Sequence, residues 1–239
     1  MLVGTGKDQT HLLIAVTADR GLAGAFNSNI VRRGVAAGRE HEADGRTPVY
    51  FASGRRPASS LTFRGMEPAE RFTVFSDRPS YSDARRIAER LMAAYVDGEV
   101  DEVEIFYNGY ISPITQIVRR ETLLPLQHAT ILEDGEEESD SDSESSGEQS
   151  GPHALVDYEP EPEEILERLV PDYVEISIFR ALLESTASEH GSRMTAMRNA
   201  SENASTLIDD LTLQMNRARQ AEITQEILEV VAGAEGLTG

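Results

Sequence analysis

Apolar residues recur at three- and four-residue steps through the last third of the chain. The series runs from Phe179 to Val231 and includes Leu183, Met194, Met197, Leu207, Leu211, Met215, Ile223 and Ile227. This spacing predicts one long helix over residues 172–231, with a coiled-coil seam along one side. Because such a helix is stabilised mainly by burying its apolar face, the seam requires another long helix or another protein as its partner.

The first 130 residues alternate between strand and helix patterns. Short apolar runs predict strands at residues 12–17, 48–52 and 103–107, with a further strand at 72–75. Helical patterns cover residues 29–40 and 82–96, and the alternation over 114–123 predicts an edge or antiparallel strand. We therefore expect an α/β fold, in which a Rossmann-like domain with a largely parallel sheet precedes the long C-terminal coiled-coil helix.

An acidic tract separates these two parts. Residues 133–148 (EDGEEESDSDSESSGE) carry nine acids and no base, a composition typical of disordered segments. A calcium loop is excluded, because the fixed ligand offsets, the central glycine and the closing glutamate are missing. The predicted organisation is an α/β domain over 1–130, an acidic insertion over 131–152, a connector with a short helix over 153–171, and the long helix over 172–239.

Charge and cysteine usage narrow the possible functions. The formal net charge of −20 argues against nucleic-acid binding, which needs clustered basic side chains. The absence of cysteine excludes disulfides, thiolate metal sites and thiol catalysis. Neither an apolar run of about 18 residues nor a signal-peptide pattern occurs. We therefore expect the chain in the cytoplasm, without insertion into a membrane.

The turn from Asp19 to Asn27 (DRGLAGAFN) follows the first predicted strand, where α/β folds place phosphate-binding loops. Its two glycines, Gly21 and Gly24, lie three residues apart without a Lys-Ser/Thr pair, so the turn matches neither the dinucleotide fingerprint nor the P-loop. We interpret it as a tight connection with Asn27 near a helix start. The alternative is a nucleotide- or small-molecule-binding enzyme that uses this turn, with the long helix as a dimerising arm.

Candidate catalytic side chains are scarce. No serine lies in a G-x-S-x-G elbow, and no nucleophile is paired recognisably with a base. His190 falls on the helical seam, where a buried or partner-facing imidazole fits better than a catalytic one. We therefore expect no catalytic residue, no cofactor and no bound metal. Metal-ligand spacing is missing among the five histidines, which are His11, His41, His128, His153 and His190.

The long helix resembles the C-terminal helix of the F-type ATP synthase gamma subunit. The resemblance lies in Met-x-x-Met-Arg-x-Ala at residues 194–200, Asn-x-Ala-Arg-Gln at 216–220 and Ile-Thr-Gln-Glu at 223–226. Thr-Ala-Asp-Arg-Gly-Leu-Ala-Gly at 17–24 is similar to a second signature of that family, and Tyr-Glu-Pro at 158–160 is a third match. The second signature supplies the turn positions Asp19, Arg20, Gly21 and Gly24, and Asn27 follows it. The resemblance covers nearly the whole chain apart from the acidic tract.

One departure from the family concerns the start of the chain. Gamma subunits begin with a further long helix that pairs antiparallel with the C-terminal helix, whereas this sequence begins at Met1, just before the first strand. The seam without a partner is thus the one that the family covers with its first helix. We expect a truncated gene product or a mis-assigned start, unless a separate chain supplies the partner. A truncated, nonfunctional gamma remnant is therefore a second alternative.

The resemblance implies a central-stalk rotor. Its coiled coil would sit inside the alpha-beta hexamer, and its α/β domain would form a foot above the membrane ring. Such a subunit transmits torque in proton-driven ATP synthesis and is itself non-catalytic. The implied partners are the alpha, beta and epsilon subunits and the membrane c-ring, and the implied location is peripheral, at the cytoplasmic face of the bacterial plasma membrane.

Residue roles follow from the same resemblance. Contacts with a beta subunit are implied for Arg219, Gln220, Thr224, Glu226 and Glu229. The collar region, where the two helices meet, is matched by Arg193, Met194, Met197 and Arg198. Glu159 corresponds to a contact with the membrane ring. Arginine suits a torque-bearing contact, because its guanidinium group forms several directed bonds without changing protonation.

Overall fold

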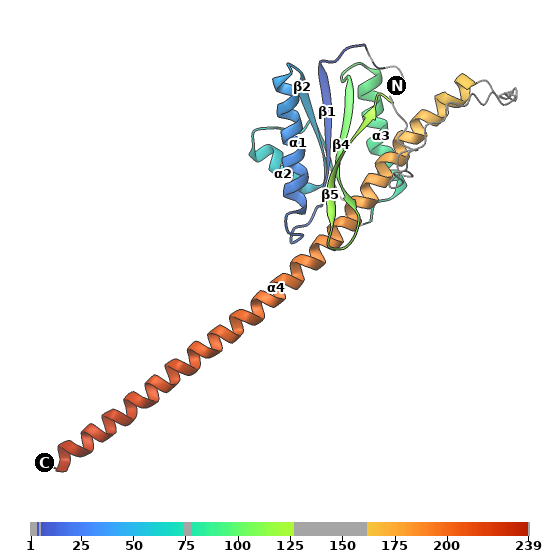
Figure 1. The fold of residues 1–239 in the computed structure, drawn as a ribbon. Coiled ribbons are helices and arrows are strands. Elements are labelled where there is room, and N and C mark those ends of the chain that lie inside the picture. The colour runs from blue at the N-terminus through green and yellow to red at the C-terminus, as the bar shows by residue number, and fades with distance from the viewer. Residues whose placement is uncertain (1–3, 5, 74–77, 127–161, 239) are drawn as a thin grey trace, which may run out of the picture.

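The computed structural model describes residues 4, 6–73, 78–126 and 162–238. In this part of the chain a five-stranded sheet has the order β3-β2-β1-β4-β5 (Figure 1). The strands β3, β2, β1 and β4 run parallel, and β5 runs antiparallel along β4. Their bounds are β1 Thr10–Val16, β2 Thr47–Ser53, β3 Glu70–Phe72, β4 Glu102–Tyr110 and β5 Gln116–Leu124.

The strand pattern follows from the sequence. Six of the seven residues of β1 are buried, as expected for a central parallel strand covered on both faces. β5 is mostly exposed or half-buried, in keeping with its place at the sheet edge. The strands expected at 12–17, 48–52 and 103–107 are confirmed, and so is the antiparallel strand expected at 114–123. β3 ends at Phe72, and residues 74–77 lie outside the described residues.

Helices cover both faces of the sheet (Figure 1). On one face lie α1 (Phe26–Ala43) and α2 (Arg55–Phe63), and on the other lie α3 (Tyr81–Val96) and the first half of α4 (Pro162–Thr238). The start of α3 is fixed by Asp83, whose carboxylate accepts a hydrogen bond from the Ser80 N–H at 2.9 Å. α2 was not expected from the sequence.

Two hydrophobic cores follow from the alternation of side chains along the strands. In β1, Leu12 and Ile14 face α3 and α4, whereas Leu13 and Ala15 face α1 and α2. Both cores are closed by large apolar side chains from the helices. The structure confirms the expected α/β fold, a Rossmann-like parallel-sheet domain followed by a long C-terminal helix.

The C-terminal helix is longer than the sequence pattern indicated. α4 spans 77 residues, about 115 Å at 1.5 Å per residue. It begins at Pro162 instead of near residue 172, so residues 162–171, expected as part of a connector with a short helix, are its first turns. Pro171 lies inside the helix, but its neighbours Val170 and Val174 are buried against the domain, and this packing offsets the hydrogen bond that proline removes.

Candidate functional site

The first half of α4 is built into the domain. Its side chains Val174 and Ile178 have no exposed surface and belong to the core shared with β1 and α3. The Ser185 hydroxyl donates to the Val16 carbonyl oxygen at 3.2 Å, and the Ser188 hydroxyl donates to that of Asn108 at 3.1 Å. α4 is thereby fixed against the carboxyl-terminal ends of β1 and β4.

Polar contacts add to this attachment at the sheet edge. Arg180 of α4 donates to a Glu121 carboxylate oxygen of β5 at 2.8 Å. The other carboxylate oxygen accepts a hydrogen bond from the Tyr107 hydroxyl at 2.5 Å. Burial raises the pKa of Tyr107 well above its ordinary value, and the bond to Glu121 raises it further, so the phenol stays a neutral donor. Glu121 therefore links α4 to two strands.

α4 also fills the crevice where sheets of this kind bind ligands. β1 and β4 are neighbours whose connecting helices lie on opposite faces, and ligands of doubly wound sheets bind beyond the carboxyl ends of such strands. Here α4 packs over the ends of both strands, because the Ser185 and Ser188 hydroxyls donate to carbonyl oxygens at those ends. At the ends of β1 and β2, the space left among Thr17, Ser53 and Glu189 has a volume of about 10 Å³, which holds a single water at most, so a nucleotide has no room there.

The turn between β1 and α1 is closed by its own hydrogen bonds. The Asn27 side-chain oxygen accepts from the Ala18 N–H at 3.1 Å, and its amide donates to the Arg20 carbonyl oxygen at 3.3 Å. One Asp19 carboxylate oxygen accepts from the Arg55 N–H at 2.8 Å, which ties the turn to the start of α2. These contacts agree with a tight βα connection, and Asn27 lies near a helix start as expected, because it is the second residue of α1.

The glycines of this turn allow close packing. A Cβ atom on Gly21 would lie 2.7 Å from the Arg56 guanidinium, so a larger residue there would displace the end of that side chain from the turn. Gly24 has φ of 57°, a left-handed conformation that favours glycine. A Cβ atom there would be 4.0 Å from that of Ala196, which shows how near the turn lies to α4. The turn thus lies close to α4 at the point where that helix leaves the domain, and we call this contact region of the turn and α4 the seat.

An open groove of about 300 Å³ lies beside this seat, between the turn, the β4–β5 hairpin and α4. It is lined by uncharged side chains such as Phe26, Asn108, Gln116 and Thr195. The described lining residues therefore offer no cation for a phosphate group. This groove and the filled crevice together disfavour the nucleotide-binding alternative.

The second half of α4 projects away from the domain (Figure 1). From Met197 to Ala234 every side chain is exposed. The large apolar side chains exposed there are Met197, Leu207, Ile208, Leu211, Leu213, Met215, Ile223, Ile227, Leu228, Val230 and Val231. In water a helix without tertiary packing is marginal, so this half of α4 presents an interaction surface.

The exposed apolar stripe continues along the base of α4. Leu169, Ile176 and Leu183 lie at seven-residue intervals and are 54%, 57% and 44% exposed, although the opposite side of the helix is buried in the core. The sequence interpretation placed the start of the seam at Phe179 and missed Leu169 and Ile176. His190 follows Leu183 at the same seven-residue interval, and this regular spacing could have identified the two missed residues.

The residues expected at the collar lie where α4 leaves the domain. Arg193 forms an ion pair with Glu189 one turn earlier, and Met194 and Met197 are 56% and 43% exposed. Arg198 is exposed and lies 3.9 Å from Glu202. These four residues thus lie together on about two turns of helix, where the packed half of α4 passes into the exposed half.

The residues expected to contact a beta subunit all lie on the exposed last third of α4. They are Arg219, Gln220, Thr224, Glu226 and Glu229. The Thr224 hydroxyl donates to the Gln220 carbonyl oxygen at 2.8 Å, and Glu229 accepts from Gln225 at 3.1 Å. Their side chains are accessible to a partner along the whole segment. Glu159, expected at the membrane ring, lies outside the described residues.

Comparison with known proteins agrees with the family resemblance of the turn and the long helix. Residues 1–237 match the family model described as ATP synthase. The ATP synthase gamma chain of Rubrobacter xylanophilus is 44% identical over 237 residues, which cover 99% of this chain and 77% of that relative. The chain belongs to the ATP synthase gamma family. The gamma chain of Rhodospirillum rubrum is 40% identical over 241 residues, again covering 99% of this chain and 77% of the relative.

Solved structures agree with the gamma-family assignment. The central stalk and c-ring structure of the Tetrahymena thermophila mitochondrial ATP synthase contains a chain with a TM-score of 0.60 and 27% identity, covering 82% of this chain and 79% of that one. A chain of the Euglena gracilis mitochondrial enzyme has the same fold, with a TM-score of 0.64 at 19% identity, covering 96% and 72%. This gamma-family chain is thus a rotor subunit of ATP synthase. Among its described helices, none is long and apolar enough to cross a membrane.

Proposed function

We propose that this chain transmits torque between the membrane c-ring and the alpha-beta catalytic hexamer, in ATP synthesis driven by protons. The observation that carries the proposal is α4, which is anchored in the domain core at one end and exposed on all sides at the other. A shaft needs this combination, because torque reaches the tip only if the base cannot slip. The domain then serves as the foot, the free half of α4 enters the hexamer, and the chain itself performs no chemistry.

A second long helix is the partner that the apolar stripe requires. The stripe runs from Leu169 on the base to Val231 near the tip, and its large side chains are 43% to 73% exposed. Fully burying one such side chain contributes about 1.5–3 kcal/mol, so a helix lying along the stripe stabilises the shaft substantially. In the assembled stalk we expect that helix to run antiparallel to α4, as the family resemblance implies.

The other partners follow from the direction of the shaft. The alpha and beta subunits surround the free half of α4, and the c-ring and the epsilon subunit contact the foot. Support comes from the similar solved structures, one of the central stalk with the c-ring and one of F1 with the c-ring. The chain is then peripheral, at the cytoplasmic face of the bacterial plasma membrane.

The contact residues at the tip form two groups on the helix surface. Arg219, Glu226 and Glu229 are separated by seven and three residues, which places them along one side of α4. Gln220 and Thr224 are four residues apart and lie on a different side. A rotating shaft presents these two sides in turn to each surrounding subunit, so we propose that both groups bond a beta subunit at different angles.

Replacement of one tip side chain tests this function. Arg219→Ala should lower the rate of ATP-driven proton pumping by about tenfold in vesicles that contain the assembled complex, because a hydrogen bond to a charged group contributes about 1.5–3 kcal/mol. Asp210→Ala is the control, since Asp210 is also an exposed charged residue of α4 but lies nine residues before Arg219, on the opposite side of the helix and outside the assigned contacts. Pumping is followed with a pH-sensitive dye. Equal rates for the two variants would contradict the assigned contact.

A further inference from the structure

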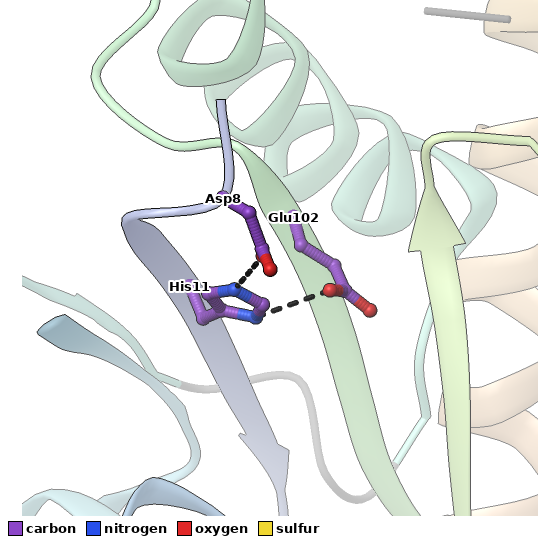
Figure 2. A group of neighbouring side chains, drawn as sticks. All are labelled: Asp8, His11 and Glu102. Carbon is purple, nitrogen blue, oxygen red and sulfur yellow. Dashed lines mark hydrogen bonds and ion pairs between the residues drawn. The ribbon is translucent and has the colours of Figure 1, made fainter. Parts of the chain in front are cut away.

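A buried histidine lies between two carboxylates at the end of the domain opposite the free half of α4. His11 is the second residue of β1 and pairs in parallel register with Glu102, the first residue of β4 (Figure 2). Asp8 lies in the segment that precedes β1. Asp8 and His11 are three residues apart in the sequence, and the parallel pairing of β1 with β4 brings the distant Glu102 beside them. The torque function assigns no role to them.

Each nitrogen of the His11 ring faces a carboxylate oxygen. Nε2 lies 2.6 Å from Asp8 Oδ1, and Nδ1 lies 3.1 Å from Glu102 Oε2 (Figure 2). A neutral imidazole has only one N–H, and the short contact assigns it to Nε2 and Asp8. Nδ1 then carries a lone pair beside an anionic oxygen inside the protein, since His11 has no exposed surface. A cation between Nδ1 and Glu102 removes this repulsion.

The second contact does not have the geometry of a hydrogen bond. Although Nδ1 and Oε2 are 3.1 Å apart, Nδ1 is a buried atom without a hydrogen-bond partner among the described residues. A proton needs a nearly straight N–H···O line, whereas a metal ion lies to one side of the line between its ligands. With both bonds near 2.1 Å, a separation of 3.1 Å corresponds to a ligand–metal–ligand angle of about 95°.

The neighbouring contacts hold all three side chains in place. Arg46 donates to the other Asp8 oxygen, Oδ2, at 2.6 Å, and the Thr122 hydroxyl donates to the other Glu102 oxygen, Oε1, at 3.3 Å. Each carboxylate is thus anchored through one oxygen and presents the second to His11. The His41 ring stacks on His11 with a centroid distance of 4.2 Å and fixes the plane of the imidazole.

We propose that His11 Nδ1 and Glu102 bind a divalent transition-metal ion of the Zn²⁺ class. Asp8 acts as the carboxylate that orients the ligating histidine through its other nitrogen, an arrangement common around protein-bound zinc. Water completes the coordination, because Glu102 is partly exposed. An imidazole with a carboxylate favours zinc and similar ions over Mg²⁺ and Ca²⁺, which prefer oxygen ligands alone. The ion then links the start of β1 to the start of β4, in the foot of the shaft.

Equilibrium dialysis of the full chain against Zn²⁺ tests the site, with bound metal measured by elemental analysis. Excess Mg²⁺ is present throughout, because the 42 Asp and Glu residues offer weak sites made of oxygen alone. Wild type should bind one Zn²⁺ per chain that Glu102→Gln binds at least about tenfold more weakly, since the variant loses a metal ligand. Glu99→Gln is the matched control, because Glu99 is exposed and contacts Arg90 instead of His11. It should bind Zn²⁺ like wild type.

A second variant separates metal binding from folding. Asp8→Asn changes a side chain that is 59% exposed, so the domain should fold, and Zn²⁺ affinity should fall by about 10- to 100-fold through loss of the orienting carboxylate. In wild type, Zn²⁺ should also raise the midpoint of thermal unfolding, and in Glu102→Gln it should not. Identical Zn²⁺ binding curves for wild type, Glu102→Gln and Asp8→Asn would overturn the proposal.

Discussion

In the chain on its own, amide hydrogens of residues 200–234 should exchange with solvent at least about a thousandfold faster than those of residues 174–190. Both segments belong to one helix, but the first has every side chain exposed and the second contributes Val174, Ile178 and Leu182 to the core. An unpacked helix opens locally at almost no cost, whereas exchange in the core requires unfolding of the domain, about 5–15 kcal/mol. Hydrogen exchange read by mass spectrometry resolves the two segments.

The comparison needs a sample of known oligomeric state, because two copies of the chain could pair through their stripes. Sedimentation measured at the protein concentration used for hydrogen exchange determines the oligomeric state. Slow exchange of residues 200–234 in a monomer would contradict the claim that this half of α4 depends on a partner. In the assembled complex the same amides should become protected.

Ile178→Ala should destabilise the domain by about 2–5 kcal/mol, because it leaves a cavity in the core at the base of the shaft. Ile178 has no exposed surface and packs in the same core as β1 and α3. The expected loss is a large part of the stability of a small domain, so the helix would detach from the sheet readily and torque would be lost at its base. Denaturant unfolding followed by circular dichroism measures the change.

Ile176→Ala is the control for this substitution. Ile176 lies two residues away on the same helix and is 57% exposed, on the stripe instead of in the core. In the isolated chain its replacement should cost less than about 1 kcal/mol. If the two variants unfolded at the same denaturant concentration, the base of α4 could not be the anchor described here.

The sheet and the seam could be predicted from the sequence because both arise from a periodic pattern of apolar residues. The apolar run of β1 and the three- and four-residue steps of α4 each have a strong period. α2 was missed because its nine residues are mostly polar or small and contain Pro57, so the pattern is too short and too weak. The start of α4 was placed too late, near Pro171, because sequence rules treat a proline as a helix break, whereas burial of Val170 and Val174 keeps the helix continuous.

The functional residues also divide into those that the sequence could indicate and those that only the structure shows. The tip and collar residues could be named only through resemblance to the gamma family, since exposed polar side chains on a helix have no distinctive pattern. The filled crevice could not be foreseen, because it depends on Ser185 and Ser188 meeting β1 and β4, which are more than 70 residues away. The same holds for His11 and Glu102, whose contact is created by strand register and not by sequence spacing.

Single-molecule rotation tests the torque function most directly. The chain contains no cysteine, so Ala43→Cys, at the exposed end of α1, gives a unique attachment point for a bead on the foot. The hexamer is fixed to a surface, and the complex includes the helix that covers the stripe. With ATP the bead should rotate continuously in one direction. A bead that stays still while the same complexes hydrolyse ATP would contradict the account.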